Sequence, residues 1–468
     1  MSKKALNNAL DNVLASLLDR RRARNQLRSL TTVPDGTVDF SSNDYLSLSS
    51  QPAVQEAFLT RLQGAVSPTT AGHNNRPSSL LGSGGSRLLD GNSPFAESLE
   101  RMLADIHGAP AALLFNSAMD ANVGLFSCVP QPGDVIIHDI LIHASVHDGM
   151  RLSRASKRIP FAHSRIWDAP GDSSASSIAK SLEAVLRGLL QEPDGSQFES
   201  GKRNVFIAVE GVYSMDGDVA PLVDIVECVE RYLSQGNGYI IVDEAHSAGI
   251  FGDRGQGLVS ELGLEKRVWA RVLGFGKAVG CAGGMVLCSP TTRSYLINYA
   301  RTLIYTTAMA FPSLASIEAA YSFLAAGQAK QLQSHLDVLV QGTHKLLLVV
   351  CARHRPPPEL LRVSPGKPRS PVIPVLTSRP RDLAKYCQLK GYMVRPIVAP
   401  TVPRGEERIR ICLHAKNSMV EVEGLIKAME EWLLKALDRG DESEGRVAIE
   451  TDEGQPSTHD RATREAKI

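Results

Sequence analysis

The chain lacks the features that mark several classes of protein. Its 51 Lys and Arg residues almost balance its 50 Asp and Glu residues, which leaves a formal net charge of +1. Without a charge excess, we expect no bulk electrostatic binding to nucleic acid or to an acidic membrane. No apolar run reaches membrane-spanning length, and the first residues lack the apolar core of a signal peptide. These absences favour a globular protein without a nucleic-acid or membrane partner.

Cysteine is also scarce and unpatterned. The seven cysteines are an odd number, and no two of them are spaced as Cys-x-x-Cys. This pattern argues against a disulfide framework and against a zinc site, so we expect no bound metal. It fits a protein that works in a reducing compartment.

The length of the chain allows two domains, each with its own core, because 468 residues exceed the usual size of one. We predict an N-terminal helix and arm over residues 1–50, a large domain over 51–305 and a small C-terminal domain over 306–438. Residues 439–468 are polar, charged and free of aromatic side chains, which predicts a disordered tail.

Two short apolar runs organise the middle of the chain. Residues 239–242 are followed by Asp243-Glu-Ala-His246, and residues 268–273 are followed by Gly274-Phe-Gly-Lys277. Short runs rich in β-branched residues, separated by helix-length segments, indicate parallel strands. Ligands bind at the carboxyl ends of such strands in open α/β sheets. We therefore expect an acid and a lysine at one rim of a sheet.

The chemistry of this acid and this lysine suggests a cofactor. Lys277 stands among Gly and apolar residues, where a desolvated amine loses its charge more easily and can form a Schiff base. Asp243, at the neighbouring strand end, is the partner that a pyridinium nitrogen needs. Either motif alone is more typical of an ordinary turn, but the two together favour pyridoxal phosphate.

A strand-to-helix turn offers a place for the phosphate of that cofactor. A strand at 111–115 is followed by Asn116-Ser-Ala-Met-Asp-Ala-Asn122, which opens a helix. Unpaired backbone amides and the positive end of the helix dipole favour an anion there. Ser117, Ala118 and Met119 are therefore candidate phosphate-binding residues.

Seven motifs give the chain a resemblance to a known family. In chain order they are residues 40–46 (FSSNDYL), 82–87 (GSGGSR), 210–218 (EGVYSMDGD), 243–249 (DEAHSAG), 274–277 (GFGK), 301–307 (RTLIYTT) and 400–403 (PTVP). The chain resembles the α-oxoamine synthases, which are fold-type-I pyridoxal-phosphate enzymes, over roughly residues 8–435. The resemblance implies an α/β fold of the aspartate aminotransferase type. Such a fold has a large domain on a mainly parallel sheet and a smaller α+β C-terminal domain.

The resemblance also implies roles for residues around the cofactor. Lys277 would carry the cofactor and move protons at the α-carbon of the amino acid, and Asp243 would keep the ring nitrogen protonated. His143 would stack on the pyridine ring. His246 and Ser214 would bond the phenolate side of the cofactor.

Four further residues are assigned by the same resemblance. Arg28 would lie near the active site, Asn43 would approach the substrate, and Arg410 would bind the carboxylate of the amino acid. Thr307 would reach the phosphate of the neighbouring subunit's cofactor, which implies a homodimer with shared active sites. Arg408 and Arg410 alternate with Ile409 along a strand, so the two arginines share one strand face. We expect Arg408 to form a surface ion pair.

The chain departs from the family at the phosphate seat. Three residues before the lysine the family often has Thr or Ser, and this chain has Gly274. The family also has Gly and an aromatic residue where this chain has Ala118 and Met119. The lost hydroxyl could loosen cofactor binding but does not remove the lysine chemistry.

The implied activity is a decarboxylating condensation of an amino acid with an acyl-CoA. The likeness is greatest to the biotin-pathway branch of the family, whose substrates are L-alanine and pimeloyl-CoA. The alternatives are a sibling enzyme that joins glycine or serine to another acyl thioester, for example in a natural-product pathway, and a catalytically silent partner subunit. The last three residues, Ala466-Lys467-Ile468, resemble a peroxisomal address of the small-basic-aliphatic type. We therefore expect the peroxisome, or otherwise the cytoplasm.

Overall fold

The structure is a computed structural model that describes residues 9–24, 26–66, 80–168 and 179–444. The chain divides into two units, Met1–Thr37 and Val38–Ile468. The first unit contains helix α1 (Ala9–Ala23), which exposes Leu10, Leu14 and Leu18. It lies within residues 1–50, where the sequence predicts an N-terminal helix and arm. The C-terminal tripeptide and most of the predicted tail lie outside the described residues.

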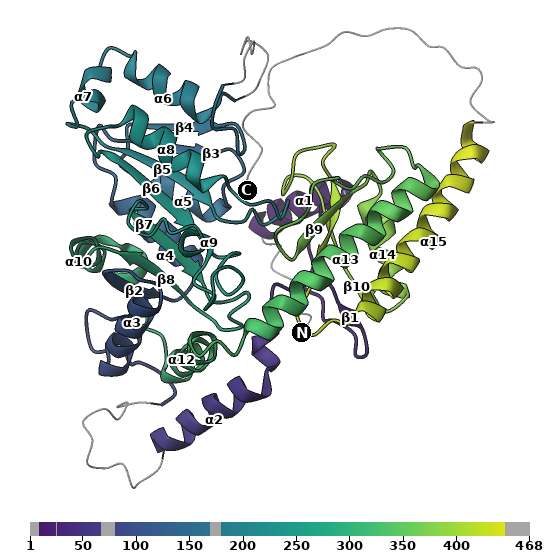
Figure 1. Cartoon of the computed structure of the whole chain (residues 1–468), viewed down its shortest axis with the longest axis horizontal. Helices are drawn as coiled ribbons and strands as arrows, with labels where there is room; N and C mark the ends of the chain where they lie inside the picture. Colours follow the sequence, from purple (N-terminus) through teal and green to yellow (C-terminus); the bar gives the residue numbers. More distant parts are fainter. Residues whose placement is uncertain (1–8, 25, 67–79, 169–178, 445–468) are drawn as a thin grey trace, which may run out of the picture. The chain divides into compact units, whose positions relative to one another are not determined.

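A seven-stranded sheet forms the centre of the second unit (Figure 1). Its strands are β2 (Ala111–Phe115), β3 (Val135–Asp139), β4 (Lys157–Phe161), β5 (Val205–Glu210), β6 (Gly238–Asp243), β7 (Ala270–Gly274) and β8 (Gly284–Cys288). Their order is β2-β8-β7-β6-β5-β3-β4. The neighbours from β7 to β4 pair in parallel, and β8 runs antiparallel to both β7 and β2.

Apart from the edge strand β4, whose residues alternate in burial, the strands of this sheet are buried on both faces, which explains their continuous apolar runs. Ile137 and Ile207 belong to a core cluster with helices α6, α8 and α9, whereas Ile136 and Phe206 belong to one with α4, α5 and α10. Neighbouring residues of one strand thus face opposite layers of helices.

The helices around this sheet and beyond it begin and end as follows. They are α2 (Pro52–Val66), α3 (Pro94–Ile106), α4 (Ala118–Cys128), α5 (Ala144–Leu152), α6 (Leu182–Leu190), α7 (Gly195–Glu199), α8 (Leu222–Tyr232), α9 (Leu258–Glu261), α10 (Pro290–Tyr299), α11 (Arg301–Ile304), α12 (Phe311–Ala325), α13 (Lys330–His354), α14 (Pro380–Leu389) and α15 (Met419–Glu444), with a short 3-10 turn, η1 (Leu48–Ser50).

A second, smaller sheet follows later in the chain. Strands β9 (Val372–Leu376), β12 (Arg408–Cys412) and β11 (Arg395–Ile397) are antiparallel in the order β11-β12-β9, and β1 (Val38–Asp39) pairs with β10 (Tyr392–Met393). The segment after β1 runs beside β12, because Cys412 N–H donates to the Phe40 carbonyl and Ala415 N–H donates to the Tyr45 carbonyl. This contact brings the first of the seven motifs, residues 40–46, next to the arginines of β12.

The fold class predicted from the sequence is confirmed, and the predicted strand at 111–115 matches β2. One detail differs, because the last helix continues to Glu444 and so enters the segment 439–468 that was expected to be disordered. The proposed domain boundaries stay a prediction.

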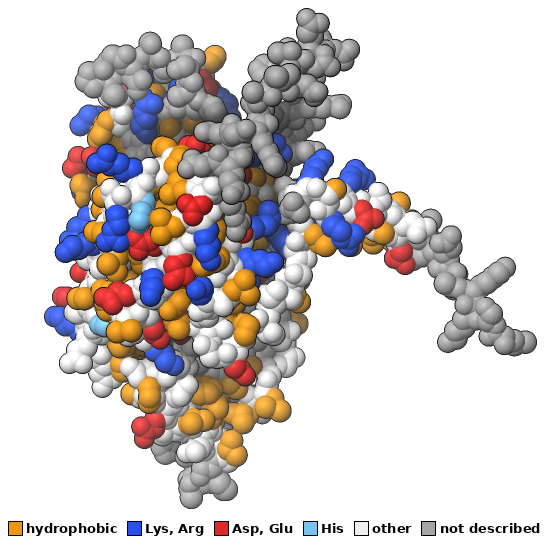
Figure 2. Space-filling view, turned by 90° about the vertical axis from the view of Figure 1, so that its right-hand side faces the viewer, with side chains coloured by type: hydrophobic (Ala, Val, Ile, Leu, Met, Phe, Trp, Pro, Cys, Tyr) orange, Lys and Arg blue, Asp and Glu red, His pale blue; other side chains and the backbone are white. Residues whose placement is uncertain are grey.

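Among the described residues, α13 is the one helix long and apolar enough to cross a membrane by length and composition. One of its faces, which includes Leu336, Leu339 and Leu347, packs in the core of the second unit, as in a helix of a globular protein. Figure 2 shows basic and acidic side chains interspersed on one face of the molecule, in keeping with the small net charge.

Candidate active site

The carboxyl ends of three neighbouring parallel strands meet at one cavity. Glu210 at the end of β5 lies directly beside Asp243 at the end of β6, and Lys277 follows the end of β7. The cavity has a volume of about 270 Å³. Its lining residues are Ala118, Met119, Asn122, His143, Ser145, Glu210, Asp243, Ala245, His246 and Lys277. Six of the residues predicted from the sequence therefore line one space.

Asp243 is held as a hydrogen-bond acceptor at the floor of this cavity. Its Oδ1 accepts from Ala245 N–H at 2.9 Å, and its Oδ2 accepts from the Asn122 side-chain amide at 2.7 Å. Both contacts suit an ionised carboxylate, because that group can only accept hydrogen bonds. The side chain is 6% exposed, so its orientation is fixed by the protein.

Burial controls the protonation of the two other ionisable groups on the floor. Burial lowers the pKa of Lys277, Asp243 and Glu210 partly oppose that shift, and Arg410 adds to it. Burial raises the pKa of Glu210 well above its usual range, and the neighbouring Asp243 raises it further. The site therefore combines an amine that gives up its proton easily with a carboxyl group that keeps one.

Two histidines flank the floor from different elements. His143 caps the N-terminus of α5, and its Nδ1 lies 2.7 Å from Ser145 Oγ. His246 Nδ1 lies 2.8 Å from the Tyr45 hydroxyl. Burial lowers the pKa of His246 well below its usual value, and the charges of Lys277 and Arg410 add to this shift. His246 is therefore neutral in the folded protein.

The predicted phosphate seat is the N-terminus of α4. Ser117 is its N-cap: the Oγ accepts from Asp120 N–H at 3.0 Å and donates to Asp120 Oδ2 at 2.8 Å. The Asp120 carboxylate is itself favoured by the helix dipole, so it reduces the positive potential that an incoming phosphate would meet. Ala118 and Met119, the next two residues, line the cavity.

The two departures from the family at this seat are physically connected. A Cβ atom added to Gly274 would lie 3.1 Å from Ala245 Cβ and 3.2 Å from Ala118 Cβ. The methyl group of Ala118 therefore occupies space that a side chain at position 274 would need. The missing hydroxyl at 274 and the extra methyl at 118 form one local rearrangement.

A second group of predicted residues lies where the small sheet meets the motif loops. Arg410 of β12 donates from Nη2 to Asn43 Oδ1 and from Nη1 to the Ser214 carbonyl, both at 2.8 Å. The Tyr45 hydroxyl donates to Asn43 Oδ1 at 3.1 Å and so links this group to His246. Asn43, Ser214 and Arg410 are thus brought together, and Tyr45 connects them to the cavity.

The expectation for Arg408 is wrong in one respect. It does form an ion pair, with Asp216, but the Arg408 side chain is only 3% exposed. Its Nε also donates to the Glu406 carbonyl at 2.8 Å. Arg408 and Arg410 do share one strand face, as predicted, because both reach the turn at 214–216.

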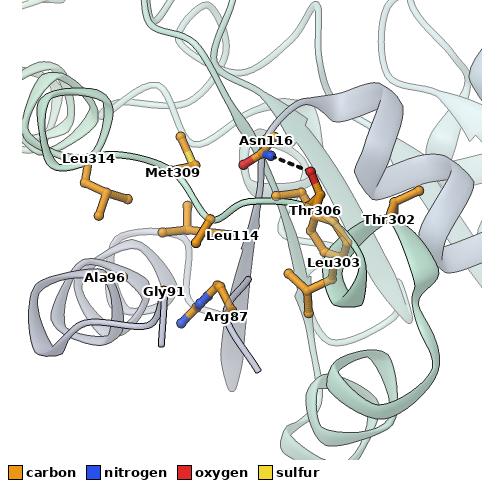
Figure 3. A pocket seen from close by; sticks show the side chains of 12 residues that line it. Arg87, Gly91, Ala96, Leu114, Asn116, Thr302, Leu303, Thr306, Met309 and Leu314 are labelled. Carbon is orange, nitrogen blue, oxygen red and sulfur yellow. Dashed lines mark hydrogen bonds between the residues drawn. The ribbon is translucent and has the colours of Figure 1, made fainter. Parts of the chain in front are cut away.

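Thr307 lies at the edge of a second cavity rather than in the first. Asn116 donates to the Thr307 carbonyl at 2.9 Å and to the Thr306 hydroxyl at 3.2 Å. The neighbouring cavity, about 370 Å³, is lined mostly by apolar side chains together with Arg87, Asn116, Thr302 and Thr306 (Figure 3). The Thr307 side chain is exposed and lines neither of these two cavities.

Arg28 belongs to the first unit, Met1–Thr37, where its side chain is exposed, and its role stays a prediction. Sequence reasoning missed Asn122, Ser145, Glu210 and Tyr45. Tyr45 and Glu210 stand inside quoted motifs, so the motifs could have indicated them. Nothing in the sequence distinguishes Asn122 or Ser145 from ordinary polar residues of a helix.

The cavity fits pyridoxal phosphate. It offers a buried amine, a carboxylate fixed beside it and a helix N-terminus at one end. Asn122 Oδ1 and Glu210 Oε1 are buried and have no hydrogen-bond partner among the described residues. Buried polar atoms without partners are costly, so their presence in a cavity favours a polar ligand there.

Comparisons with known proteins agree with this site. The family model "Aminotransferase class I and II" matches residues 35–429. The 8-amino-7-oxononanoate synthase of Emericella nidulans is 50% identical over 90% of this chain and 95% of its own length. The aminoacyl transferase sphA of Byssochlamys spectabilis is 35% identical over 91% of this chain and 87% of its own length.

The solved structures extend the likeness to the fold. A serine palmitoyltransferase from S. paucimobilis, solved with bound pyridoxal phosphate and myriocin, superposes with a TM-score of 0.72 at 21% identity. The match covers 92% of this chain and 98% of that one. The chain therefore belongs to the aminotransferase class I and II family, as a pyridoxal-phosphate-dependent α-oxoamine synthase.

Proposed function

We propose that this protein is an 8-amino-7-oxononanoate synthase. It would condense L-alanine with pimeloyl-CoA and release CoA and carbon dioxide, a step of biotin biosynthesis. The observation that carries the proposal is the 50% identity to the Emericella nidulans enzyme over almost its whole length. The site supports it, because Lys277 and Asp243 line one cavity and Arg410 is linked to that cavity through Asn43 and Tyr45.

Pyridoxal phosphate, when bound, supplies an aldehyde for the lysine and a ring that withdraws electrons from the α-carbon. Lys277 is buried and its pKa is lowered, so its amine is suited to accept the α-proton of the amino acid and to return one later. Asp243, fixed by Asn122 and Ala245, would hold a proton on the ring nitrogen. His143 and His246, which both line the cavity, would orient the ring.

Arg410 would bind the carboxylate of the amino acid until that group leaves as carbon dioxide. A guanidinium group matches a carboxylate in charge and in geometry. Asn43 and the Ser214 carbonyl hold the guanidinium group of Arg410 in one orientation. Arg28 stays a proposed substrate-binding residue.

The test is CoA release by the purified holoenzyme given L-alanine and pimeloyl-CoA. We expect release with this pair and little with glycine, serine or palmitoyl-CoA. Release only with another pair would replace the substrate assignment and keep the family. Lys277→Ala provides the control without the essential amine.

The second candidate is a sibling enzyme with another acyl donor. The 35% identity to an aminoacyl transferase over 91% of this chain favours it over more remote activities. The silent partner subunit is disfavoured, because Lys277, Asp243 and His246 line one cavity. A protein that binds no pyridoxal phosphate and releases no CoA from any pair would restore that alternative.

We also propose a homodimer with shared active sites. The exposed side chain of Thr307, the exposed Tyr305 two residues before it, and the exposed Leu81 and Leu89 support this assembly. Sedimentation at equilibrium would test it. A monomer with full activity would exclude a shared site.

Peroxisomal import is a further proposal, supported by the C-terminal Ala466-Lys467-Ile468. A fluorescent protein fused to the N-terminus should enter peroxisomes, and deletion of the three residues should leave it in the cytoplasm. An unchanged distribution after the deletion would remove the proposal.

A further inference from the structure

A line of buried hydrogen bonds connects the floor of the cavity to His143. Asn122 of α4 and Ser145 of α5 both line the cavity and are 1% and 0% exposed. The Asn122 Nδ2 atom donates to Asp243 Oδ2 at 2.7 Å and to Ser145 Oγ at 2.9 Å. Ser145 Oγ then lies 2.7 Å from His143 Nδ1. The line joins two residues of the proposed chemistry through two residues that no motif had indicated.

The direction of each hydrogen bond follows from the atoms. An amide nitrogen can only donate, so both Asn122 hydrogens are used, one on Asp243 and one on Ser145. Ser145 Oγ accepts one of them, which leaves its own hydrogen for His143 Nδ1. The Ser145 backbone N–H also donates to His143 Nδ1, at 3.2 Å. Nδ1 therefore carries a lone pair, and the proton of a neutral His143 ring must be on Nε2.

The charged groups around this ring oppose a second proton. Protonation of Nδ1 would set its hydrogen against the hydrogens of the Ser145 hydroxyl and backbone N–H. Lys277 lines the same cavity, and His143 is one of the groups whose charge lowers the pKa of His246, so positive charges at these positions oppose one another. The backbone of His143 contacts Glu210.

We propose that Asn122 and Ser145 are positioning residues that hold His143 as a neutral imidazole with its proton on Nε2. In this state His143 is a fixed hydrogen-bond donor and does not shuttle protons, and Lys277 moves the proton at the α-carbon. The inference rests on the proposed function only for the role that the Nε2–H donor of His143 has in the reaction. The state of the ring is a property of the protein with any substrate or with none.

The protonation of each nitrogen of the His143 ring can be measured directly. We would record ¹⁵N NMR of the holoenzyme labelled in histidine, with twelve histidines in the chain, and assign the His143 signals by their loss in His143→Gln. We expect a neutral ring with its proton on Nε2 between about pH 6 and 9. In Ser145→Ala the ring should populate the other tautomer or gain a second proton within that range, and Ser145→Thr should restore the parent spectrum.

Kinetics give a second readout with a matched control. Ser145→Ala should lower kcat about 10- to 100-fold, the range for groups that orient a functional histidine, with the KM for acyl-CoA unchanged. Ser127→Ala is the control, because Ser127 Oγ donates only to the Gly124 carbonyl in the same helix α4 and is outside the cavity lining. It should match the parent in both measurements.

Two results would overturn the inference. One is a His143 ring that carries its proton on Nδ1, or carries two protons, in the parent holoenzyme. The other is a Ser145→Ala spectrum identical to that of the parent. If Ser145→Ala does not fold, Asn122→Ser takes its place, because it removes the amide group that donates to Ser145 Oγ. A spectrum of Asn122→Ser identical to that of the parent would then overturn the inference. A parent spectrum as expected with no CoA release from any substrate pair would reject the proposed function alone.

Discussion

The site has two sides that are built in different ways. One side is the floor of the cavity, which consists of strand ends of one sheet: Glu210 and Asp243 are neighbours because β5 and β6 are in register, and Lys277 follows the next strand. The other side lies outside the cavity lining and joins Asn43, Ser214 and Arg410, from three distant parts of the chain, by individual hydrogen bonds.

Because of this difference, we expect substitutions at the floor to affect the reaction itself and substitutions on the other side to affect recognition of the substrate. The floor depends on backbone pairing, which tolerates side-chain changes, so a substitution there removes a chemical group and little else. The other side depends on a few side chains that hold one another, so a substitution there should change the fit of the substrate. Four substitutions test this comparison, from the largest expected effect to the smallest.

Lys277→Ala should cause the largest loss, because it removes the amine at the floor. We expect kcat to fall by more than about 10²- to 10⁴-fold, the usual contribution of a positioned acid-base group, since the link to the cofactor is lost as well. Thermal unfolding should show an intact fold. CoA release close to that of the parent would contradict the assignment of Lys277.

Arg410→Ala should act on recognition. The KM for L-alanine should rise about 10- to 100-fold, as expected for the loss of a hydrogen-bonded charged partner, with the KM for pimeloyl-CoA nearly unchanged. Arg410→Lys keeps the charge but cannot contact both Asn43 and the Ser214 carbonyl, and we expect it to recover only part of the loss. An equal rise in both KM values would show that Arg410 is structural.

Tyr45→Phe tests the connection between the two sides. It removes the hydroxyl that contacts both Asn43 Oδ1 and His246 Nδ1. Activity should fall about 2- to 10-fold, the effect of one net hydrogen bond, without loss of stability beyond that amount. Tyr386→Phe, on α14 and bonded to Glu431, is the matched control and should behave as the parent.

His163→Gln should leave chemistry nearly intact and change the pH dependence of stability. Burial would lower the pKa of His163, but hydrogen bonds to Asp139 and Asp218 raise it to about 10. A raised pKa gives stability that is complete below the ordinary histidine pKa of about 6.5 and is lost as the pH rises through about 10.

We therefore expect the parent to lose stability between about pH 6.5 and 10, and the variant to be less stable at pH 6 by about 1–3 kcal/mol. Urea unfolding at several pH values would measure both. Parallel pH profiles for the two proteins would show that His163 is not charged in the fold.

The sequence was sufficient for the floor of the site and for the fold class. Lys277 and Asp243 follow apolar runs, and parallel strands bring such positions to one edge. The sequence was not sufficient to predict strand β8. Its five residues follow a Gly-rich turn and show no alternation of polar and apolar side chains, and the strand is antiparallel to both of its neighbours. Nor could the sequence reveal Arg408 as buried, because the partner, Asp216, is separated from it by most of the second half of the chain.

Asn122 and Ser145 show a further limit of sequence reasoning. Both are polar residues in the first turns of ordinary helices, and their function in the line to His143 exists only once α4 and α5 pack side by side. Side chains that act through another side chain carry no local signal, because the signal is the three-dimensional contact itself.

The turn after Ser214 packs tightly against the small sheet. Gly217 is buried and has a φ of 70°, and a Cβ atom there would lie 2.0 Å from the Val372 carbonyl oxygen of β9. A side chain at this position would push the first strand of the small sheet outward, and β12, paired to that strand, would move with it. The proposed binding of the amino acid by Arg410 would thus depend on Gly217, a residue outside the cavity lining, and engineering of this turn would tune selectivity.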